Sequence, residues 1–327
     1  MAIVFASAAS SACSLVAGFQ TLNEGASDAG APSLPGAPGT PPSVAPTSDA
    51  GLGAVSSEDA GDSGGAASTA DAGADASEAG PFTPASLGAG LVVWLDASKG
   101  VTQAAGKVSR WADQSGQGND AAQALAARQP SVHPGALAKK PTIAFDGVAS
   151  GLGLADAASL RWGLEDYTIE IVAGYTNTPS TDDVVGYGAL WTKGTPAYPY
   201  PGVALFGNSI AGAATSNLLV QVKSPDDTPR GWVNSKADGL NDGTFRVYGT
   251  RRVGQTKLEA RVDGAITAAT IGPVDVSTGG QPVFIGSRDG SLQLLHGEIA
   301  EIVAYRGALS DADIATLEAY LRTKYTP

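Results

Sequence analysis

The chain has 327 residues and a formal net charge of −12. Residues 1–86 hold nine acidic residues and no lysine or arginine, which leaves 23 of the 32 acidic residues against all 20 basic ones in residues 87–327. No basic stripe is present to contact phosphates, so composition excludes a nucleic-acid partner. The only cysteine, Cys13, excludes a disulfide within the chain and a CxxC metal site.

Residues 1–22 are similar to an export signal that ends in a lipid-attachment motif. Residues 1–12 are uncharged and finish in small side chains, as the end of a secretory signal peptide does. Ser10, Ser11 and Ala12 then precede Cys13, which resembles a bacterial lipobox. The resemblance implies that Cys13 is acylated and that the protein is sorted to the outer membrane. The alternative is an ordinary signal peptide, so we expect an exported protein that is lipid-anchored at the outer membrane or cell surface, or secreted.

Residues 23–86 form a predicted disordered linker. They consist mainly of Ala, Gly, Ser, Pro, Asp and Thr. Large apolar side chains are nearly absent, so the segment cannot bury enough surface to offset the entropy lost on ordering. A flexible chain of this length spans about 45 Å on average. We therefore expect a tether that holds the following domain away from a surface.

Residues 87–327 show short apolar or alternating runs between turn residues, the pattern of one all-β domain. The runs at 91–95 and 108–111 place Trp94 and Trp111 in the core. The other expected strands are 141–145, 167–175, 188–192, 203–206, 218–223, 245–250, 257–263, 283–286 and 298–305. Many short strands with regular turns favour a two-sheet antiparallel jelly-roll sandwich.

Residues 257–262 (KLEARV) show the clearest period of two. Their apolar members predict a buried face and their charged members a face in solvent. Asp263 and Gly264 follow, and they predict a hairpin with a type I′ turn.

A short helix is expected at the C-terminal end. Ser310 can cap it, with Asp313 three positions on. Ile314, Leu317 and Leu321 then fall on one helical face, which predicts that the helix packs on the outside of the sandwich.

Motifs at both ends of this domain resemble bacterial laminin-G-like domains of the concanavalin A-like lectin/glucanase superfamily. The motifs are WLDAS at 94–98, WADQSGQGNDA at 111–121, FDG at 145–147, GEIAEIVAY at 297–305 and YLRTKY at 320–325. The resemblance implies a jelly roll of two antiparallel sheets. Members of this family bind carbohydrates or proteins, hydrolyse glycans or decorate surface proteins, so fold alone does not choose the function.

Catalytic residues are not expected. The ExDxxE string that glucanases of this superfamily carry is absent. Glu298 and Glu301 point to opposite faces of a regular strand and are interpreted as turn and edge residues. His133 and His296 lie in no zinc motif and are interpreted as surface or satisfied buried residues. Glycan hydrolysis by a divergent enzyme is the alternative.

A calcium site is possible at the turn 113–120. Asp113, Asn119 and Asp120 could supply hard oxygen ligands. The alternative is structural, because Asp and Asn stabilise tight turns by local hydrogen bonds.

Sugar binding requires exposed aromatic rings together with amide or carboxylate groups. Prolines stiffen residues 195–202, which lowers the entropy cost of binding there. The candidate ligand-binding residues are Trp191, Tyr198, Tyr200, Asn208, Asn217 and Trp232. The alternative is that these aromatic rings fill the sandwich or cover a sheet edge.

The sequence therefore predicts a surface-tethered, non-enzymatic module that binds carbohydrate or a surface glycoconjugate. Protein–protein adhesion through a sheet face is the alternative in a different class. We expect a monomer with no cofactor other than the possible calcium ion.

Overall fold

A computed structural model describes residues 80–178, 186–195, 200–209 and 215–325. Contacts divide the chain into two units, Met1–Ala72 and Gly73–Pro327. The predicted signal region with Cys13 and nearly all of the predicted linker lie outside the described residues. Within the described residues, no helix is both long and apolar enough to cross a membrane.

The described part of the chain forms seventeen strands, three short 3-10 helices and one α-helix. The strands are β1 (Leu91–Asp96), β2 (Val101–Ala104), β3 (Lys107–Trp111), β4 (Ala121–Ala122), β5 (Ser131–Leu137), β6 (Lys140–Asp146), β7 (Leu152–Leu154), β8 (Tyr167–Tyr175), β9 (Gly188–Gly194), β10 (Gly202–Ser209), β11 (Thr215–Lys223), β12 (Arg230–Asn234), β13 (Arg246–Val253), β14 (Lys257–Val262), β15 (Ala265–Thr270), β16 (Val283–Ile285) and β17 (His296–Arg306). The helices are η1 (Pro84–Leu87), η2 (Ala126–Arg128), η3 (Ala158–Leu160) and α1 (Asp311–Tyr325).

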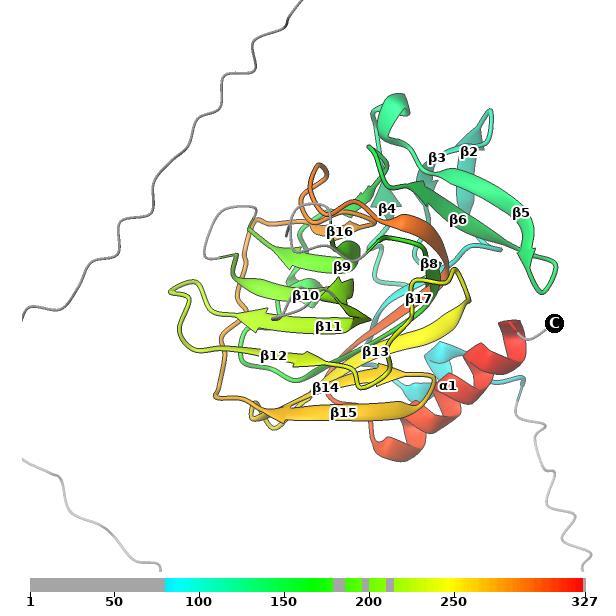
Figure 1. Cartoon of the computed structure of the whole chain (residues 1–327). Helices are drawn as coiled ribbons and strands as arrows, with labels where there is room; N and C mark the ends of the chain where they lie inside the picture. The colour runs from blue at the N-terminus through cyan, green and yellow to red at the C-terminus, as the bar shows by residue number, and fades with distance from the viewer. Residues whose placement is uncertain (1–79, 179–185, 196–199, 210–214, 326–327) are drawn as a thin grey trace, which may run out of the picture. The chain divides into compact units, whose positions relative to one another are not determined.

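Hydrogen bonding arranges the strands in two runs. One run is β5–β6–β17–β8–β13–β14–β15, and β1 pairs with the second half of β17. The other run is β4–β7–β16–β9–β10–β11–β12. Figure 1 shows β9 to β12 side by side in this order, with α1 beside β13 and β14.

The prediction of an antiparallel all-β domain with a C-terminal helix is confirmed. Two separate jelly-roll sheets are not what the pairing shows. β3 pairs with β2, β4 and β5, and so it joins both runs into one antiparallel network.

The core contains a ladder of stacked aromatic rings. Trp162 stacks on Tyr167 with ring centroids 4.7 Å apart and on Trp191 at 6.2 Å. Trp111 belongs to the same core, and Trp94 belongs to a second apolar cluster that includes residues of α1. The predicted core positions of Trp94 and Trp111 are confirmed.

The predicted hairpin between β14 and β15 is present. Asp263 and Gly264 have φ angles of 49° and 87°, which are the positive values that a type I′ turn requires. The predicted solvent face of β14 is wrong, however, because Glu259 and Arg261 are buried.

Helix α1 covers the outer face of β13 and β14 and supplies partners for these charges. Ser310 caps it as predicted, since its hydroxyl accepts a hydrogen bond from the Asp313 N–H at 3.1 Å. Glu318 on the buried side of α1 lies 2.8 Å from Arg261. Charged residues can therefore occupy this face because the helix brings the opposite charge.

Arg251 and Glu170 extend this charged cluster along the sheet. Arg251 makes two hydrogen bonds to Glu259, each of 3.0 Å, and reaches Asp311 of α1 at 2.6 Å. Both carboxylate oxygens of Glu170 are buried and have no hydrogen bond within the described residues, and Arg261 lies 3.6 Å away. Burial, together with repulsion from Glu318, raises the pKa of Glu170 well above its ordinary value.

A second charged cluster anchors the end of α1. The Lys324 ammonium lies 2.7 Å from Asp96 of β1 and 2.6 Å from Glu301 of β17. Glu301 also accepts hydrogen bonds from the Trp94 indole at 2.7 Å and from the Tyr325 hydroxyl at 2.8 Å. Glu301 is fully buried in the middle of a strand, so its interpretation as a turn or edge residue is wrong.

Replacing Lys324 with methionine should lower the free energy of unfolding by about 3–5 kcal/mol, because the change leaves two buried carboxylates without their cation. Denaturant unfolding measures the loss. Lys99→Met is the control, since exposed Lys99 lies 3.8 Å from the same Asp96 and its removal should change stability by less than about 1 kcal/mol. Equal losses in the two variants would contradict this assignment.

Replacing Glu170 with glutamine should stabilise the protein at neutral pH. A carboxyl group whose pKa is raised by folding stabilises the protein below its unfolded pKa, and this contribution is lost as the pH rises through the folded pKa. The melting temperature of Glu170→Gln should exceed that of wild type at pH 7–8, and the two should converge near pH 4. A difference that does not depend on pH would show that Glu170 does not titrate as inferred.

Candidate functional site

The outer face of β9, β10, β11 and β12 carries the candidate site. Strand register brings one residue from each strand into a single row: Thr192, Ala204, Gln221 and Trp232. Directly paired residues project from the same face of a sheet, so these four side chains are neighbours on one surface. Trp232 is 49% exposed, whereas Thr192 and Ala204 are buried.

The adjacent row explains why this surface is uneven. It consists of Gly194, Gly202, Lys223 and Arg230. A Cβ atom at Gly202 would lie 1.9 Å from the carbonyl oxygen of Lys193, so only glycine fits there. Small residues on β9 and β10 therefore lie beside long polar side chains on β11 and β12. This contrast in size leaves a depression above the two glycines.

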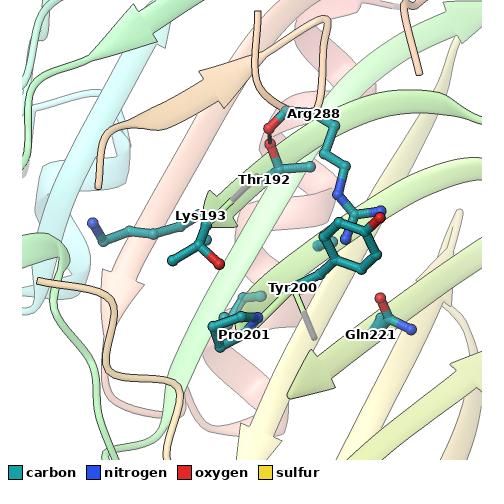
Figure 2. A pocket seen from close by; sticks show the side chains of 11 residues that line it. Thr192, Lys193, Tyr200, Pro201, Gln221 and Arg288 are labelled. Atoms are coloured by element: carbon teal, nitrogen blue, oxygen red, sulfur yellow. Dashed lines mark hydrogen bonds between the residues drawn. The ribbon is translucent and has the colours of Figure 1, made fainter. Parts of the chain in front are cut away.

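The depression is a small hollow of about 10 Å³, room for about one water molecule, and it is partly open to solvent. Tyr200, Gln221 and Arg288 lie around it together with Thr192 and Gly202. Figure 2 shows the Arg288 side chain lying against the Tyr200 ring, with Gln221 on the neighbouring strand. The guanidinium carbon of Arg288 is 3.9 Å from the ring centroid, close enough for a cation–π interaction. The hollow therefore combines an aromatic ring, an amide and a cation.

Hydrogen bonds hold the floor of the hollow in place. The Thr192 hydroxyl lies 3.1 Å from the carbonyl oxygen of Ser287 and 2.9 Å from that of Arg288, which ties β9 to the loop that carries Arg288. The Lys193 ammonium points the other way and donates to Asp156 at 2.9 Å. Burial lowers the pKa of Lys193, and Asp156 opposes this effect. Lys193 therefore supports β9 and does not face a ligand in the hollow.

Trp232 extends the surface beyond the hollow. Its ring lies 5.9 Å from the Arg230 guanidinium carbon, and Arg230 lies 3.1 Å from Asp227. Gln221 on β11 is directly paired with Trp232 on β12. The exposed indole and the amide are thus side by side at the edge of the hollow.

Two of the six predicted ligand-binding residues are interior residues. Trp191 is fully buried in the core ladder, so it presents no ring face to a ligand. Asn208 is also fully buried, and its amide donates to the carbonyl oxygens of Asn177 at 2.8 Å and Gly186 at 2.9 Å. Their predicted role in binding is wrong because both side chains stabilise the fold.

The other predicted residues differ in position. Tyr200 and Trp232 lie on the candidate face. Asn217 is half-buried on β11, and its side-chain oxygen has no hydrogen bond within the described residues. Tyr198 lies outside the described residues.

Sequence reasoning missed Gln221 and Arg288. Gln221 could have been found, because the apolar residues of β11 alternate with it and place it on the outer face. Arg288 could not, because it comes from a segment far along the chain whose position depends on the fold.

The predicted calcium ligands form a hydrogen-bonded turn. The Asp113 carboxylate accepts the N–H groups of Trp94 and Ser115 at 2.9 Å and that of Asn119 at 3.0 Å. Asp120 pairs with Arg110 at 2.6 Å. Within the described residues, no group of three or more His, Cys, Asp or Glu side chains could hold a metal ion. Calcium binding at this turn stays a prediction.

Glu298 and the two histidines lie at a different surface. A second hollow contains Glu298, His296 and Phe245 among its lining residues. The His133 ring lies 2.8 Å from Glu298, which also accepts a hydrogen bond from Thr142. Glu301 is buried and does not share this surface. Glu298 and Glu301 therefore cannot flank one glycosidic bond.

Comparison with known proteins supports the fold. No protein-family model matches the chain, so its membership of the laminin-G-like family stays a prediction. No curated protein matches it in sequence. The binding domain of Paraclostridial Mosquitocidal Protein 1 has a similar structure, with a TM-score of 0.53 and 13% identity over 71% of this chain and 52% of that chain.

A second similar structure concerns botulinum neurotoxin type C, whose cell entry is described as dependent upon interaction with two ganglioside molecules. Its TM-score is 0.52, with 10% identity over 73% of this chain and 53% of that chain. The match spans about half the length of each of these solved structures. At such low identity the similarity is one of fold alone.

Trp191 and Trp232 lie on opposite faces of this sheet, and their replacement by alanine should differ in its effect on stability. Trp191→Ala should lower the free energy of unfolding by about 3–5 kcal/mol, because it opens a large cavity in the core. Trp232→Ala should change it by less than about 0.5 kcal/mol, because the side chain is exposed. Denaturant unfolding measures both, and a large loss in Trp232→Ala would contradict its surface position.

Proposed function

We propose that the protein is a non-enzymatic module that binds carbohydrate on the outer face of β9–β12. The exposed Trp232 beside Gln221, at the edge of the hollow, is the observation that carries this proposal. An exposed indole offers a flat apolar face for the C–H side of a sugar ring. An amide and a guanidinium beside it can hydrogen-bond sugar hydroxyls.

The surface is suited to orienting a ligand because its parts are already in place. Arg288 is held against Tyr200, and its backbone carbonyl accepts the Thr192 hydroxyl. Gln221 is on a strand that pairs on both sides, so its position is set by the sheet. Rigid side chains lose less entropy on binding, which favours affinity for weakly interacting ligands such as sugars.

Two further observations support binding over catalysis. Glu301 is buried, which removes the nearest candidate partner for Glu298 as a glycosidase pair. One similar fold is the binding domain of Paraclostridial Mosquitocidal Protein 1, and the other comes from a structure of botulinum neurotoxin type C, whose cell entry is dependent upon ganglioside interaction. These similarities support a binding role through fold, and the residues of the candidate face supply the chemistry.

The sequence supports a location at the cell surface for this module. The lipobox-like motif at Cys13 and the acidic segment that follows it would anchor the protein and hold residues 87–327 away from the membrane. A lipid-anchored module at a surface meets glycans of neighbouring cells or of the envelope. Calcium at Asp113, Asn119 and Asp120 is not required by this proposal.

A glycan array with the full chain tests the proposal. We expect binding to a defined glycan class, and Trp232→Ala and Gln221→Ala should each weaken it at least tenfold, equivalent to about 1.4 kcal/mol. Leu125→Ala is the matched control, because Leu125 is an exposed residue outside β9–β12. This variant should bind the glycan as wild type does. Binding that survives both substitutions would reject this face.

Two companion assays, protein capture and sugar release, separate the alternatives. Capture of a surface protein stripped of glycans, with no glycan bound on the array, would favour protein–protein adhesion. Release of sugar from a polysaccharide panel would show hydrolysis and would overturn the non-enzymatic assignment.

A further inference from the structure

Strand β15 is an edge strand without the usual protection. It pairs with β14 on one side only within the described residues. Its sequence, AITAAT, contains no charge and no proline. Natural edge strands are commonly blocked by charged residues, proline or bulges, because unpaired backbone groups attract another strand. β15 has none of these devices, and Ile266 on it is 48% exposed.

The hairpin turn determines which backbone groups of β15 are free to pair outward. A two-residue turn at Asp263 and Gly264 makes Val262 and Ala265 a hydrogen-bonded pair. Hydrogen-bonded pairs then recur at every second residue along β14 and β15. The same alternation places Thr256 opposite Ile271, and the Ile271 N–H does donate to the Thr256 carbonyl oxygen at 2.7 Å.

The N–H and C=O groups of the alternate residues consequently point away from β14. These residues are Ile266, Ala268 and Thr270, and all three are exposed. Ala268 lies midway between the other two, so the set of outward groups is symmetric about it.

Charge does not oppose the approach of a second copy at this edge. Glu259 and Arg261 are the neighbours of Ala268 and Ile266 on β14, and both are buried. They pair with Arg251 and Glu318 beneath α1. The middle of the edge, at Ala268 and Ile266, therefore has no exposed charge on its β14 neighbours, and exposed Lys257 lies beside Thr270 at the end of the edge.

The edge strand of the other run is different. In β12, too, every second residue forms a hydrogen-bonded pair with β11. The N–H and C=O groups of the residues between them, Arg230, Trp232 and Asn234, therefore point away from β11. Arg230 is charged and Trp232 is bulky, and both hinder the close approach of another strand. Of these two edges, β15 is therefore the open one.

We propose that β15 pairs antiparallel with β15 of a second copy, with Ala268 opposite Ala268 and Ile266 opposite Thr270. A twofold axis at Ala268 matches every outward donor with an outward acceptor across three residue pairs. This pairing joins the sheets of two copies into one. A single strand pair buries less area than a standard interface, so the dimer is weak and depends on concentration. The sequence alone had led us to expect a monomer.

Sedimentation velocity of the full chain tests the association. We expect a monomer–dimer equilibrium that shifts with concentration in wild type and is abolished in Ala268→Lys, which introduces the charge that edge strands commonly carry. Ala104→Lys is the control, because Ala104 is exposed on β2 and should leave the equilibrium unchanged. Melting temperatures identify any variant that fails to fold. A wild type that stays monomeric up to about 1 mM overturns the proposal.

Engineered cysteines test the register. In a Cys13→Ser background, Ala268→Cys should form an intermolecular disulfide, because facing Cα atoms of a hydrogen-bonded pair lie about 5.5 Å apart. Thr270→Cys should not, because Thr270 faces Ile266 of the other copy. Crosslinking of both variants at equal rates, or of neither, would overturn the proposed pairing.

Discussion

Charges buried between α1 and the outer face of the sheet constrain the rest of the domain. Arg251, Glu259 and Arg261 project from β13 and β14 and find partners in each other and in the helix. A slip of one residue in either strand would turn these side chains into the apolar core. Buried ion pairs add little net stability over apolar packing, but an unpaired buried charge is costly. The charges therefore select one register and one position of α1.

This constraint explains which parts of the fold could be predicted. Eleven of the seventeen described strands and the 263–264 turn follow from local patterns, so they were predictable. The other six described strands were not among those expected, and these are β2, β4, β5, β7, β12 and β15. The alternation in β14 predicted a solvent-exposed face, because charged side chains in a strand are usually exposed. Helix α1 packs on this face and buries Glu259 and Arg261. Glu301 looked like an edge residue for the same reason, although Lys324, distant along the chain, neutralises it. Long-range pairing of charges leaves no local signal in a single sequence.

The candidate site was predictable in part. Aromatic residues drew attention to Tyr200 and Trp232, which do lie at the surface of β9–β12. The same reasoning failed at Trp191, because Trp191 alternates with Thr192 along β9 and therefore faces the core when Thr192 lies on the outer face. Arg288 reaches the hollow from the segment after β16, and the hydrogen bond between Thr192 and its backbone fixes that approach. Such proximity depends on the completed fold.

The pairing of β1 with β17 has a consequence for biosynthesis. The first and last strands of the domain are hydrogen-bonded neighbours, and Lys324 of α1 neutralises Asp96 on β1. During synthesis the early strands cannot complete their sheet until almost the whole chain has left the ribosome. Contacts so distant in sequence slow folding, because the intervening loop must close first. The core of such a nascent chain cannot close until the last strand and the helix are available.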